Sequence, residues 1–150
     1  MKSLFDPPVV GEVQQRLMHL TELSGRKWGT MNPAQALAHC SAAMEMATGK
    51  SRPPRALIGR IIGRAIKSRV LSDEEQMRKN SPTTKILLVK DERNFAGERI
   101  RLSGLIDDFA GSSREGCTTH PHPFFGPLTA DEWAVLMYKH LDHHLRQFGV

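Results

Sequence analysis

The feature that most constrains the fold is a helical segment with almost no charge, between Asn32 and Gly49. Asn32 is a typical N-cap residue, Pro33 suits a first helical turn, and glycine is the commonest residue after a helix end. The interior of the segment, AQALAHCSAAMEMA, has a single charged residue, Glu45. A helix that is apolar nearly all round is stable only when most of its faces are buried. The segment therefore predicts a core helix surrounded by other helices.

Three more segments have apolar residues at helical spacing, over residues 8–24, 94–110 and 129–148. Gly25 predicts the end of the first of these. Thr129 and Glu132 form a T-x-x-E capping box that predicts the start of the last. No strand pattern of comparable length competes, and we interpret the short apolar run 85–90 as part of a connector.

The connector of residues 50–93 is too long for a tight turn between neighbouring antiparallel helices. A long middle connection indicates that the second and third bundle helices run parallel and are joined by a crossover. We therefore predict an all-α four-helix bundle with an extra short helix in the crossover. With 150 residues, of which 39% are hydrophobic, the chain can bury a core as one domain over residues 1–150.

The segment 50–69 is strongly basic and contains no acidic residue. Three of its cations share one helical face, opposite four isoleucines: Arg60, Arg64 and Lys67 against Ile58, Ile61, Ile62 and Ile66. This pattern predicts an amphipathic helix that packs on another part of the protein through its isoleucines and has a solvated basic face. The net charge of +5 also permits nucleic-acid binding, but a solvated surface is the favoured interpretation. The GxxxG spacing of Gly59 and Gly63 indicates little outside a membrane span.

The two cysteines, Cys40 and Cys117, have neither paired nor CxxC spacing. Lone thiols of this kind are typical of reduced cytosolic proteins rather than of disulfide frameworks. The amino-terminal sequence MKSLFDPPVV resembles neither a signal peptide nor a membrane span. We therefore expect a cytoplasmic protein with no membrane partner.

The last helical segment carries the chemistry. One stripe that should face the core contains Trp133, Leu136, Met137, His140, His144 and Gln147, so it changes from apolar to polar halfway along. Buried imidazoles are costly unless each finds a partner. Histidines at i and i+4, such as His140 and His144, can chelate one metal ion. The chain has no HExxH or ExxH motif, which excludes a zincin and a di-iron carboxylate bundle.

His39 is the candidate for a third ligand, because it lies inside the nearly uncharged second helix. In the predicted topology the second and fourth helices are antiparallel, so His39 would face the carboxy-terminal half of the fourth. Three neutral histidines leave a divalent ion with at least one open position, which is typical of catalytic sites. The sequence therefore predicts one divalent metal ion at His39, His140 and His144.

Five other residues are predicted to lie beside these ligands or to line the site: Gln35, Gln147, His143, His122 and Trp133. Gln147 could orient a ligand histidine. His143 lies at the edge of the stripe, so it is a surface residue or a neighbour of the ligands. A structural role in the Pro-rich loop is the favoured interpretation for His122, and a core or groove-lining role for Trp133. Cys117, His120 and His122 form a C-x-x-H-x-H cluster, which is only a weak metal signal.

The sequence resembles the DinB-like metal-binding four-helix bundles, and within them an uncharacterised branch. The resemblance rests on a Q-x-x-x-H segment (Gln35 and His39), a long crossover, and above all HPFFGPLTADEWAVLMYKHLDHHLRQFG. It implies that His39, His140 and His144 hold a divalent ion, often zinc or nickel. It also implies frequent dimers, and relatives that include transferases or isomerases using a low-molecular-weight thiol, beside many with no known activity.

Three functions follow as alternatives. The first is a metal-dependent hydrolase or thiol transferase acting on a small molecule, and the second is a non-catalytic metal-binding or interaction module. The third, a nucleic-acid-binding surface, is the least favoured. The enzyme interpretation lacks an obvious general base, since Asp142 projects off the stripe and Glu45 lies two turns from His39. A homodimer is the expected assembly.

Overall fold

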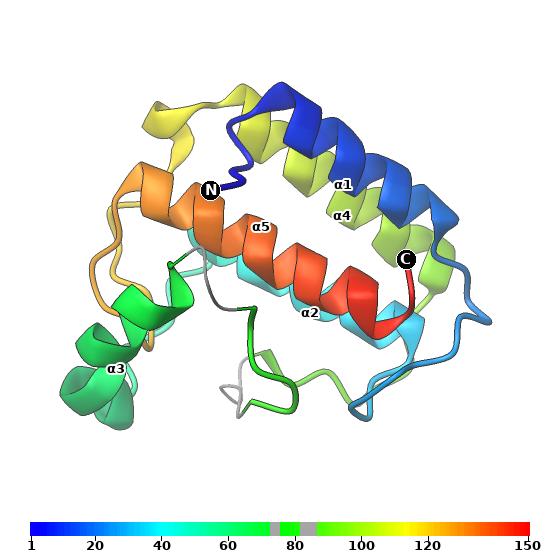
Figure 1. The fold of residues 1–150 in the computed structure, drawn as a ribbon, viewed down its shortest axis with the longest axis horizontal. Helices are drawn as coiled ribbons and strands as arrows, with labels where there is room; N and C mark the ends of the chain where they lie inside the picture. The colour runs from blue at the N-terminus through cyan, green and yellow to red at the C-terminus, as the bar shows by residue number, and fades with distance from the viewer. Residues whose placement is uncertain (73–75, 82–86) are drawn as a thin grey trace.

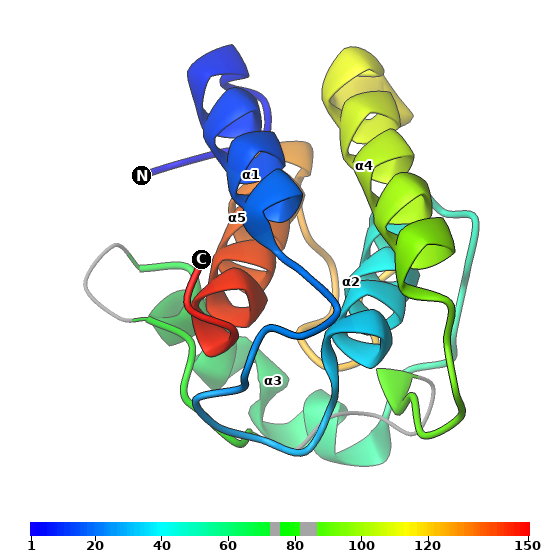
Figure 2. The ribbon, with the colours of Figure 1, turned by 90° about the vertical axis from the view of Figure 1, so that its right-hand side faces the viewer.

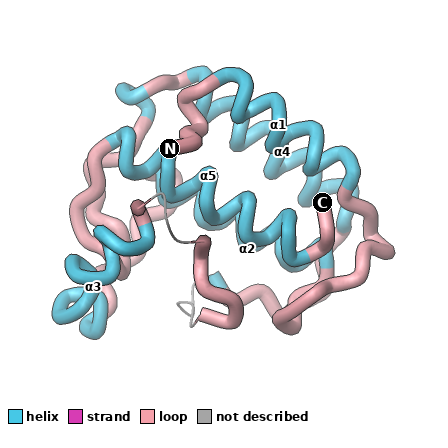
Figure 3. Tube along the Cα trace, viewed as in Figure 1, coloured by secondary structure: helices cyan, strands magenta, loops and turns pink. Residues whose placement is uncertain are grey.

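The structure, a computed structural model, describes residues 1–72, 76–81 and 87–150. Its helices are α1 (Pro7–His19), α2 (Pro33–Ala47), α3 (Leu57–Val70), α4 (Phe95–Gly111) and α5 (Ala130–Gln147), and the short 3₁₀ helix η2 (Arg114–Gly116) precedes the last. Within the described ranges there is no strand (Figure 3). The predicted all-α class is confirmed.

Four of the helices, α1, α2, α4 and α5, form a bundle (Figures 1 and 2). α2 packs on α4 and α5, and α1 packs on the same two helices from the other side. α2 and α4 run in one direction while α1 and α5 run in the opposite one (Figure 1). This is the predicted crossover topology, and it sets the amino-terminal half of α2 beside the carboxy-terminal half of α5.

α2 is a core helix, as its composition predicts. Its start is fixed by a reciprocal capping box: the Asn32 side chain accepts from the Gln35 backbone N–H at 2.8 Å, and the Gln35 side chain accepts from the Asn32 N–H at 3.0 Å. Of its 15 residues, 12 are buried, which leaves almost no solvent-facing stripe. Its many alanines allow α4 and α5 to approach closely. Gly49, with φ of 75°, turns the chain away after the helix end.

α1 is shorter than predicted. It ends at His19, and Leu20 already has extended backbone angles. Leu20 is 2% exposed, so the chain leaves the helix in order to bury this side chain. A local turn follows, in which Ser24 Oγ accepts from the Thr21 N–H at 3.0 Å. The predicted end at Gly25 is therefore wrong, because a buried leucine and a hydroxyl-stabilised turn end the helix earlier.

The other two bundle helices begin and end within about two residues of their predicted bounds. Asn94 caps α4 by accepting from the Gly97 N–H at 2.7 Å. Thr129 and Glu132 form the predicted capping box of α5, with distances of 3.2 Å and 2.8 Å. Residues 85 and 86 of the apolar run 85–90 lie outside the described residues. The helices that carry the candidate ligands therefore have firmly defined starts.

α3 lies outside the four-helix bundle (Figures 1 and 2) and packs on the loop 123–126 through its glycines. Gly59 and Gly63 are its buried residues. A Cβ atom at Gly59 would lie 2.6 Å from the Phe124 carbonyl oxygen, and one at Gly63 would lie closer still. The predicted packing through isoleucines is wrong, since Ile58 and Ile61 are 60% and 83% exposed. The glycines permit backbone-to-backbone approach, and this places the isoleucines outward.

None of the helices in the described ranges has the length and apolar character needed to cross a membrane.

Candidate metal centre

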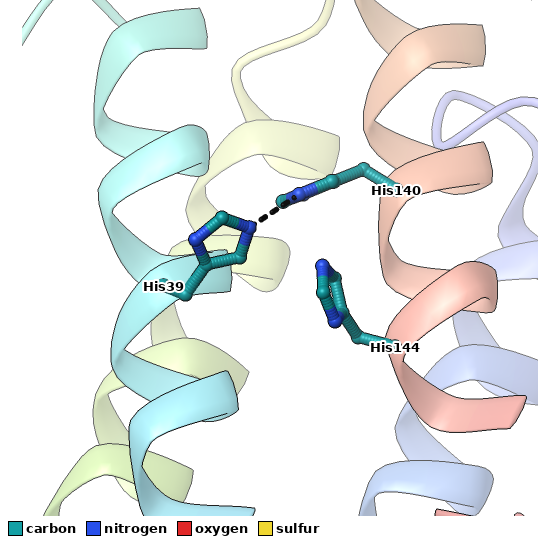
Figure 4. A group of neighbouring side chains, drawn as sticks. All are labelled: His39, His140 and His144. Carbon is teal, nitrogen blue, oxygen red and sulfur yellow. Dashed lines mark hydrogen bonds between the residues drawn. The ribbon is translucent and has the colours of Figure 1, made fainter. Parts of the chain in front are cut away.

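Three imidazoles converge between α2 and α5 (Figure 4). His39 projects from α2, and His140 and His144 project from successive turns of α5. One nitrogen of each ring lies within 4.8 Å of the others, and the Nε2 atoms of His39 and His140 are 2.9 Å apart. Among the described residues, no other group of three or more histidine, cysteine or acidic side chains comes together in this way. The fold thus brings the three predicted ligands together.

His39 is held in one tautomer by the connector. Its Nδ1 lies 2.8 Å from the carbonyl oxygen of Leu87. Because a carbonyl only accepts hydrogen bonds, Nδ1 carries the proton and Nε2 keeps its lone pair. Burial lowers the pKa of His39, and the backbone hydrogen bond to Leu87 partly opposes this shift. The ring is therefore neutral at physiological pH, with its lone pair directed towards α5.

His144 is held in the same tautomer by Gln147. Its Nδ1 lies 2.8 Å from Gln147 Oε1, and the amide nitrogen of Gln147 donates to the Trp28 carbonyl at 2.7 Å. The Trp28 carbonyl therefore fixes which end of the amide faces the imidazole. Gln147 is 2% exposed. Burial lowers the pKa of His144 to about 3, with a further contribution from His39. Nδ1 of His144 donates, and its Nε2 is left as a ligand atom.

His140 completes the group. Burial holds its pKa well below the ordinary histidine value, and the nearby His144 and His39 lower it further. Because His39 Nε2 has no proton, the 2.9 Å contact is a hydrogen bond that His140 Nε2–H donates. The two facing nitrogens share a single proton, so a divalent cation in its place would receive a lone pair from each.

The donor set fits a divalent transition metal. Neutral imidazole nitrogens are ligands that zinc, nickel and copper all accept. Two nitrogens on one tetrahedral zinc ion are roughly 3.3 Å apart, as follows from metal–nitrogen distances of about 2.0–2.1 Å. The observed separations, from 2.9 Å up to 4.8 Å, bracket that value.

Gln35, which is predicted to lie beside the ligands, has a different role. Its side-chain oxygen completes the α2 capping box, and its amide nitrogen donates to the Asp91 carbonyl at 3.2 Å. The amide therefore ties α2 to the connector rather than to a ligand histidine. Gln147 is the glutamine that contacts the site.

His143 is buried, with 8% exposure, although its position at the edge of the stripe also allowed a surface location. Its ring packs against Trp28 at 5.4 Å and against His144 at 5.0 Å. Burial lowers its pKa, and a backbone hydrogen bond with Met77 opposes the shift. His143 does not belong to the three-nitrogen group. It packs beside the site as a neighbour of His144.

The loop histidines, His120 and His122, form hydrogen bonds with backbone groups. His122 Nδ1 accepts from the N–H groups of Phe124 and Phe125, both at 3.1 Å. Burial, reinforced by the charge of Arg55, lowers the pKa of His122 to about 4. His120 Nε2 donates to the Pro53 carbonyl at 3.0 Å. The structural interpretation of this loop fits the observed contacts.

Cys117 and Cys40 are free thiols. Burial raises the pKa of Cys117 to about 11, and Cys40 is 3% exposed with a pKa displaced upward by burial as well. Both are therefore protonated and poor metal ligands at neutral pH. The C-x-x-H-x-H spacing does not produce a metal-type cluster among the described residues.

Trp133 lies about two turns before His140 on α5 and is 1% exposed. Its ring packs against His122 at 5.4 Å, so it links the loop to the ligand stripe. Its indole Nε1 is buried and has no hydrogen-bond partner in the described part of the chain. This donor is a candidate contact for a molecule bound at the site.

The two carboxylates nearest to the ligands in sequence are engaged elsewhere. Asp142 pairs with Arg16 at 2.8 Å and with Arg146 at 2.9 Å. Glu45 pairs with Arg101 at 2.6 Å. Neither belongs to the three-nitrogen group. The sequence did not indicate the carbonyls of Leu87 and Trp28 as partners of the site, because a backbone acceptor can belong to any residue type.

The comparison with known families gives one match. A family model described as "Protein of unknown function (DUF1569)" matches residues 6–149, which include all three histidines. No curated protein and no solved structure matches the chain. The DinB-like resemblance is not part of this match and stays a prediction. Because the match covers nearly the whole chain, the protein belongs to the DUF1569 family of proteins of unknown function.

Proposed function

We propose that this protein binds one divalent ion, zinc or nickel, through His39, His140 and His144, and uses it on a small-molecule substrate. The observation that carries the proposal is the convergence of three neutral imidazoles within 4.8 Å. In two of them, hydrogen bonds to Leu87 and Gln147 hold the proton on Nδ1 and leave Nε2 for the ion. Outer partners of this kind are typical of histidine metal sites.

Three protein ligands leave room for a molecule from solution, which favours a catalytic site over a closed structural one. When bound, the ion would supply Lewis-acid activation of a substrate atom at that open position. We propose metal-dependent hydrolysis or transfer of a low-molecular-weight thiol as the reaction class. The thiol alternative rests on the DinB-like resemblance.

The chain offers hydrogen-bond donors beside His140. His122 accepts two backbone N–H groups at Nδ1, so its proton lies on Nε2, where the ring can only donate. It is close enough to His140 to influence the pKa of that ring. Trp133 adds a buried indole N–H without a described partner. Such donors would orient a substrate through its oxygen atoms.

A second candidate is a non-catalytic metal-binding module. The observation in its favour is that Asp142 and Glu45, the neighbouring carboxylates, are both held in ion pairs. With its proton on Nε2, His122 is also no general base at neutral pH. A site without a general base could store or sense a metal rather than use it.

Metal analysis tests the first part of the proposal. Protein stripped with a chelator and reloaded with zinc, nickel or manganese should retain about one ion per chain. His39→Ala, His140→Ala and His144→Ala should each lose it, while His143→Ala should keep it. A site that stays empty with all three metals would overturn the metal assignment.

Activity screens separate the two candidates. Metal-loaded protein would be incubated with generic esters and with pairs of a thiol and an electrophile, beside the His140→Ala variant. Turnover that is lost in the variant supports the enzyme. Activity that survives the substitution belongs to another site, and silence in both screens favours the binding module.

We also propose a homodimer in the cytoplasm. The cytoplasmic assignment is supported by two unpaired thiols, Cys40 and Cys117. Sedimentation equilibrium of the full chain measures the assembly, and a monomer at all concentrations would contradict the dimer.

A further inference from the structure

The outward face of α3 is apolar. Four large aliphatic side chains lie exposed along it: Leu57 at 77%, Ile58 at 60%, Ile61 at 83% and Ile62 at 39%. Exposed large hydrophobic residues that stand singly are ordinary, whereas four on one helical turn and a half form a patch that needs an explanation. No segment in the described part of the chain covers them.

The orientation of this face is fixed by contacts on the opposite side. Gly59 and Gly63 press against the backbone at Phe124, where no Cβ would fit. At the carboxy-terminal end, Lys67 Nζ binds Glu132 at 2.7 Å and the Pro127 carbonyl at 3.1 Å. α3 therefore cannot rotate to bury its isoleucines without losing both the glycine packing and this ion pair.

Cations border the apolar stripe, and no acidic residue occurs between residues 50 and 72. Arg60 and Arg64 follow the stripe on one side and are exposed. The patch is thus hydrophobic at its centre and positive along one margin, and any partner must complement both properties.

Three kinds of partner can be compared on these grounds. A second copy of the chain, paired through the same face, would bring Arg60 and Arg64 against their own equivalents. A nucleic acid would satisfy the arginines through its phosphates but would leave Ile58 and Ile61 without an apolar partner. An anionic lipid surface satisfies both sets, because acyl chains accept the aliphatic side chains and headgroup phosphates accept the guanidinium groups.

We propose that α3 is an interfacial anchor that binds reversibly to anionic lipid surfaces. The sequence alone led us to expect no membrane partner. The structure changes this expectation, because the isoleucines of α3 face outward. It does not depend on the metal. With four aliphatic residues on a helix of 14 residues, the anchor needs its hydrophobic and cationic parts together.

Vesicle sedimentation of the full chain tests the proposal. The probes are large vesicles of phosphatidylcholine alone and of phosphatidylcholine with about one third phosphatidylglycerol. We expect binding to the anionic vesicles that weakens with added salt, and at least about tenfold weaker binding to the neutral ones. Ile58→Ser combined with Ile61→Ser should abolish binding, and Arg64→Gln should weaken it about fivefold, as expected for one surface charge.

Two matched controls keep the test specific. Ile100→Ser removes an isoleucine that is 74% exposed on α4, and Arg26→Gln removes an exposed cation outside α3. Both should bind vesicles as the unaltered chain does, and circular dichroism should show every variant folded. No binding to anionic vesicles, or equal losses in the controls, would overturn the proposal. So would a dimer that Ile58→Ser and Ile61→Ser dissociate, or a polyanion such as duplex DNA binding more tightly than the vesicles.

Discussion

Histidines gather in two regions of this molecule, and the two regions use them differently. Between α2 and α5, the rings of His39 and His144 donate from Nδ1 to Leu87 and Gln147. Nε2 of His39 faces Nε2 of His140. In the loop before α5, His120 Nε2 and His122 Nδ1 form hydrogen bonds with backbone groups. The loop has the closer sequence spacing, yet only the helices make a candidate metal site.

The difference lies in which lone pairs remain available. A histidine becomes a ligand when an acceptor binds its Nδ1–H, so that the proton stays on Nδ1 and the Nε2 lone pair is free in a shared space. His122 has the reverse arrangement, since its lone pair already accepts two backbone N–H groups. The partners around a ring therefore decide its chemistry, and residue spacing alone does not.

The sharpest way to break this comparison is to delete one histidine from each region. His144→Ala should weaken zinc affinity by more than about 100-fold, beyond the range for loss of an outer partner. His120→Ala should leave it unchanged, because that ring only binds the Pro53 carbonyl. Zinc titration against a chromophoric competitor measures both, and circular dichroism monitors folding. Equal losses in the two variants would mean that the regions do not differ.

Acidification should destabilise the metal-free protein through both regions. Burial lowers the pKa of His122 to about 4 and of His144 to about 3, whereas an unfolded histidine titrates near about 6.5. Below about 6.5 the unfolded chain binds more protons, so the free energy of unfolding falls as the pH drops towards the folded pKa values. Each ring contributes about 1.4 kcal/mol per pH unit in that window.

Urea unfolding at pH 7.0, 6.0 and 5.0 measures this slope. The His122→Asn variant should show a shallower slope by about 1.4 kcal/mol per pH unit, and His19→Asn, which alters an exposed residue, should not. A slope that is identical in all three proteins would show that His122 is not held neutral in the fold.

Gln147→Leu tests the outer partner of the helical region. The substitution keeps the volume roughly but removes the acceptor for His144 Nδ1 and the donor for the Trp28 carbonyl. We expect a 10- to 100-fold loss of zinc affinity, as for other outer partners. Gln35→Leu is the control, because that amide caps α2, and it should cost about 1 kcal/mol of stability with little change in affinity. Similar zinc affinities for Gln147→Leu and Gln35→Leu would show that Gln147 does not support metal binding.

Gly63→Ala should disturb the loop region and spare the helical one. Its Cβ would meet the backbone of Phe124, which cannot move aside as a flexible side chain would. We expect a loss of about 1–3 kcal/mol of stability. Gly104→Ala in α4 has open space and should be stabilising by roughly 0.5–1 kcal/mol. Thermal unfolding measures both changes in stability, and the zinc affinity of each variant should equal that of the unaltered chain. A Gly63→Ala variant that is more stable would mean that α3 does not pack on Phe124.

Much of the fold follows from local signals in the sequence. The capping residues Asn32 and Thr129 mark the helix starts, and the uncharged interior of α2 predicts its burial. The polar half of the α5 stripe, together with the crossover, places His39 opposite His140 and His144. These features are readable because each depends on helical spacing or on one residue at a helix end.

Other features depend on contacts that spacing does not encode. The orientation of α3 is set by backbone approach at Gly59 and Gly63, while hydrophobic periodicity favours the opposite face. The tautomers of His39 and His144 depend on the carbonyls of Leu87 and Trp28, which belong to connecting segments. The early end of α1 depends on the burial of Leu20. Each of these is a tertiary effect that overrides a local preference.

The central claim is that His39, His140 and His144 bind one metal ion through Nε2. Its most direct test is a crystal structure of the zinc-loaded protein with data collected on both sides of the zinc absorption edge. The claim predicts one anomalous peak between α2 and α5, about 2.0–2.1 Å from the three Nε2 atoms. A peak at the loop of His120 and His122, or no peak at all in fully loaded crystals, would contradict it.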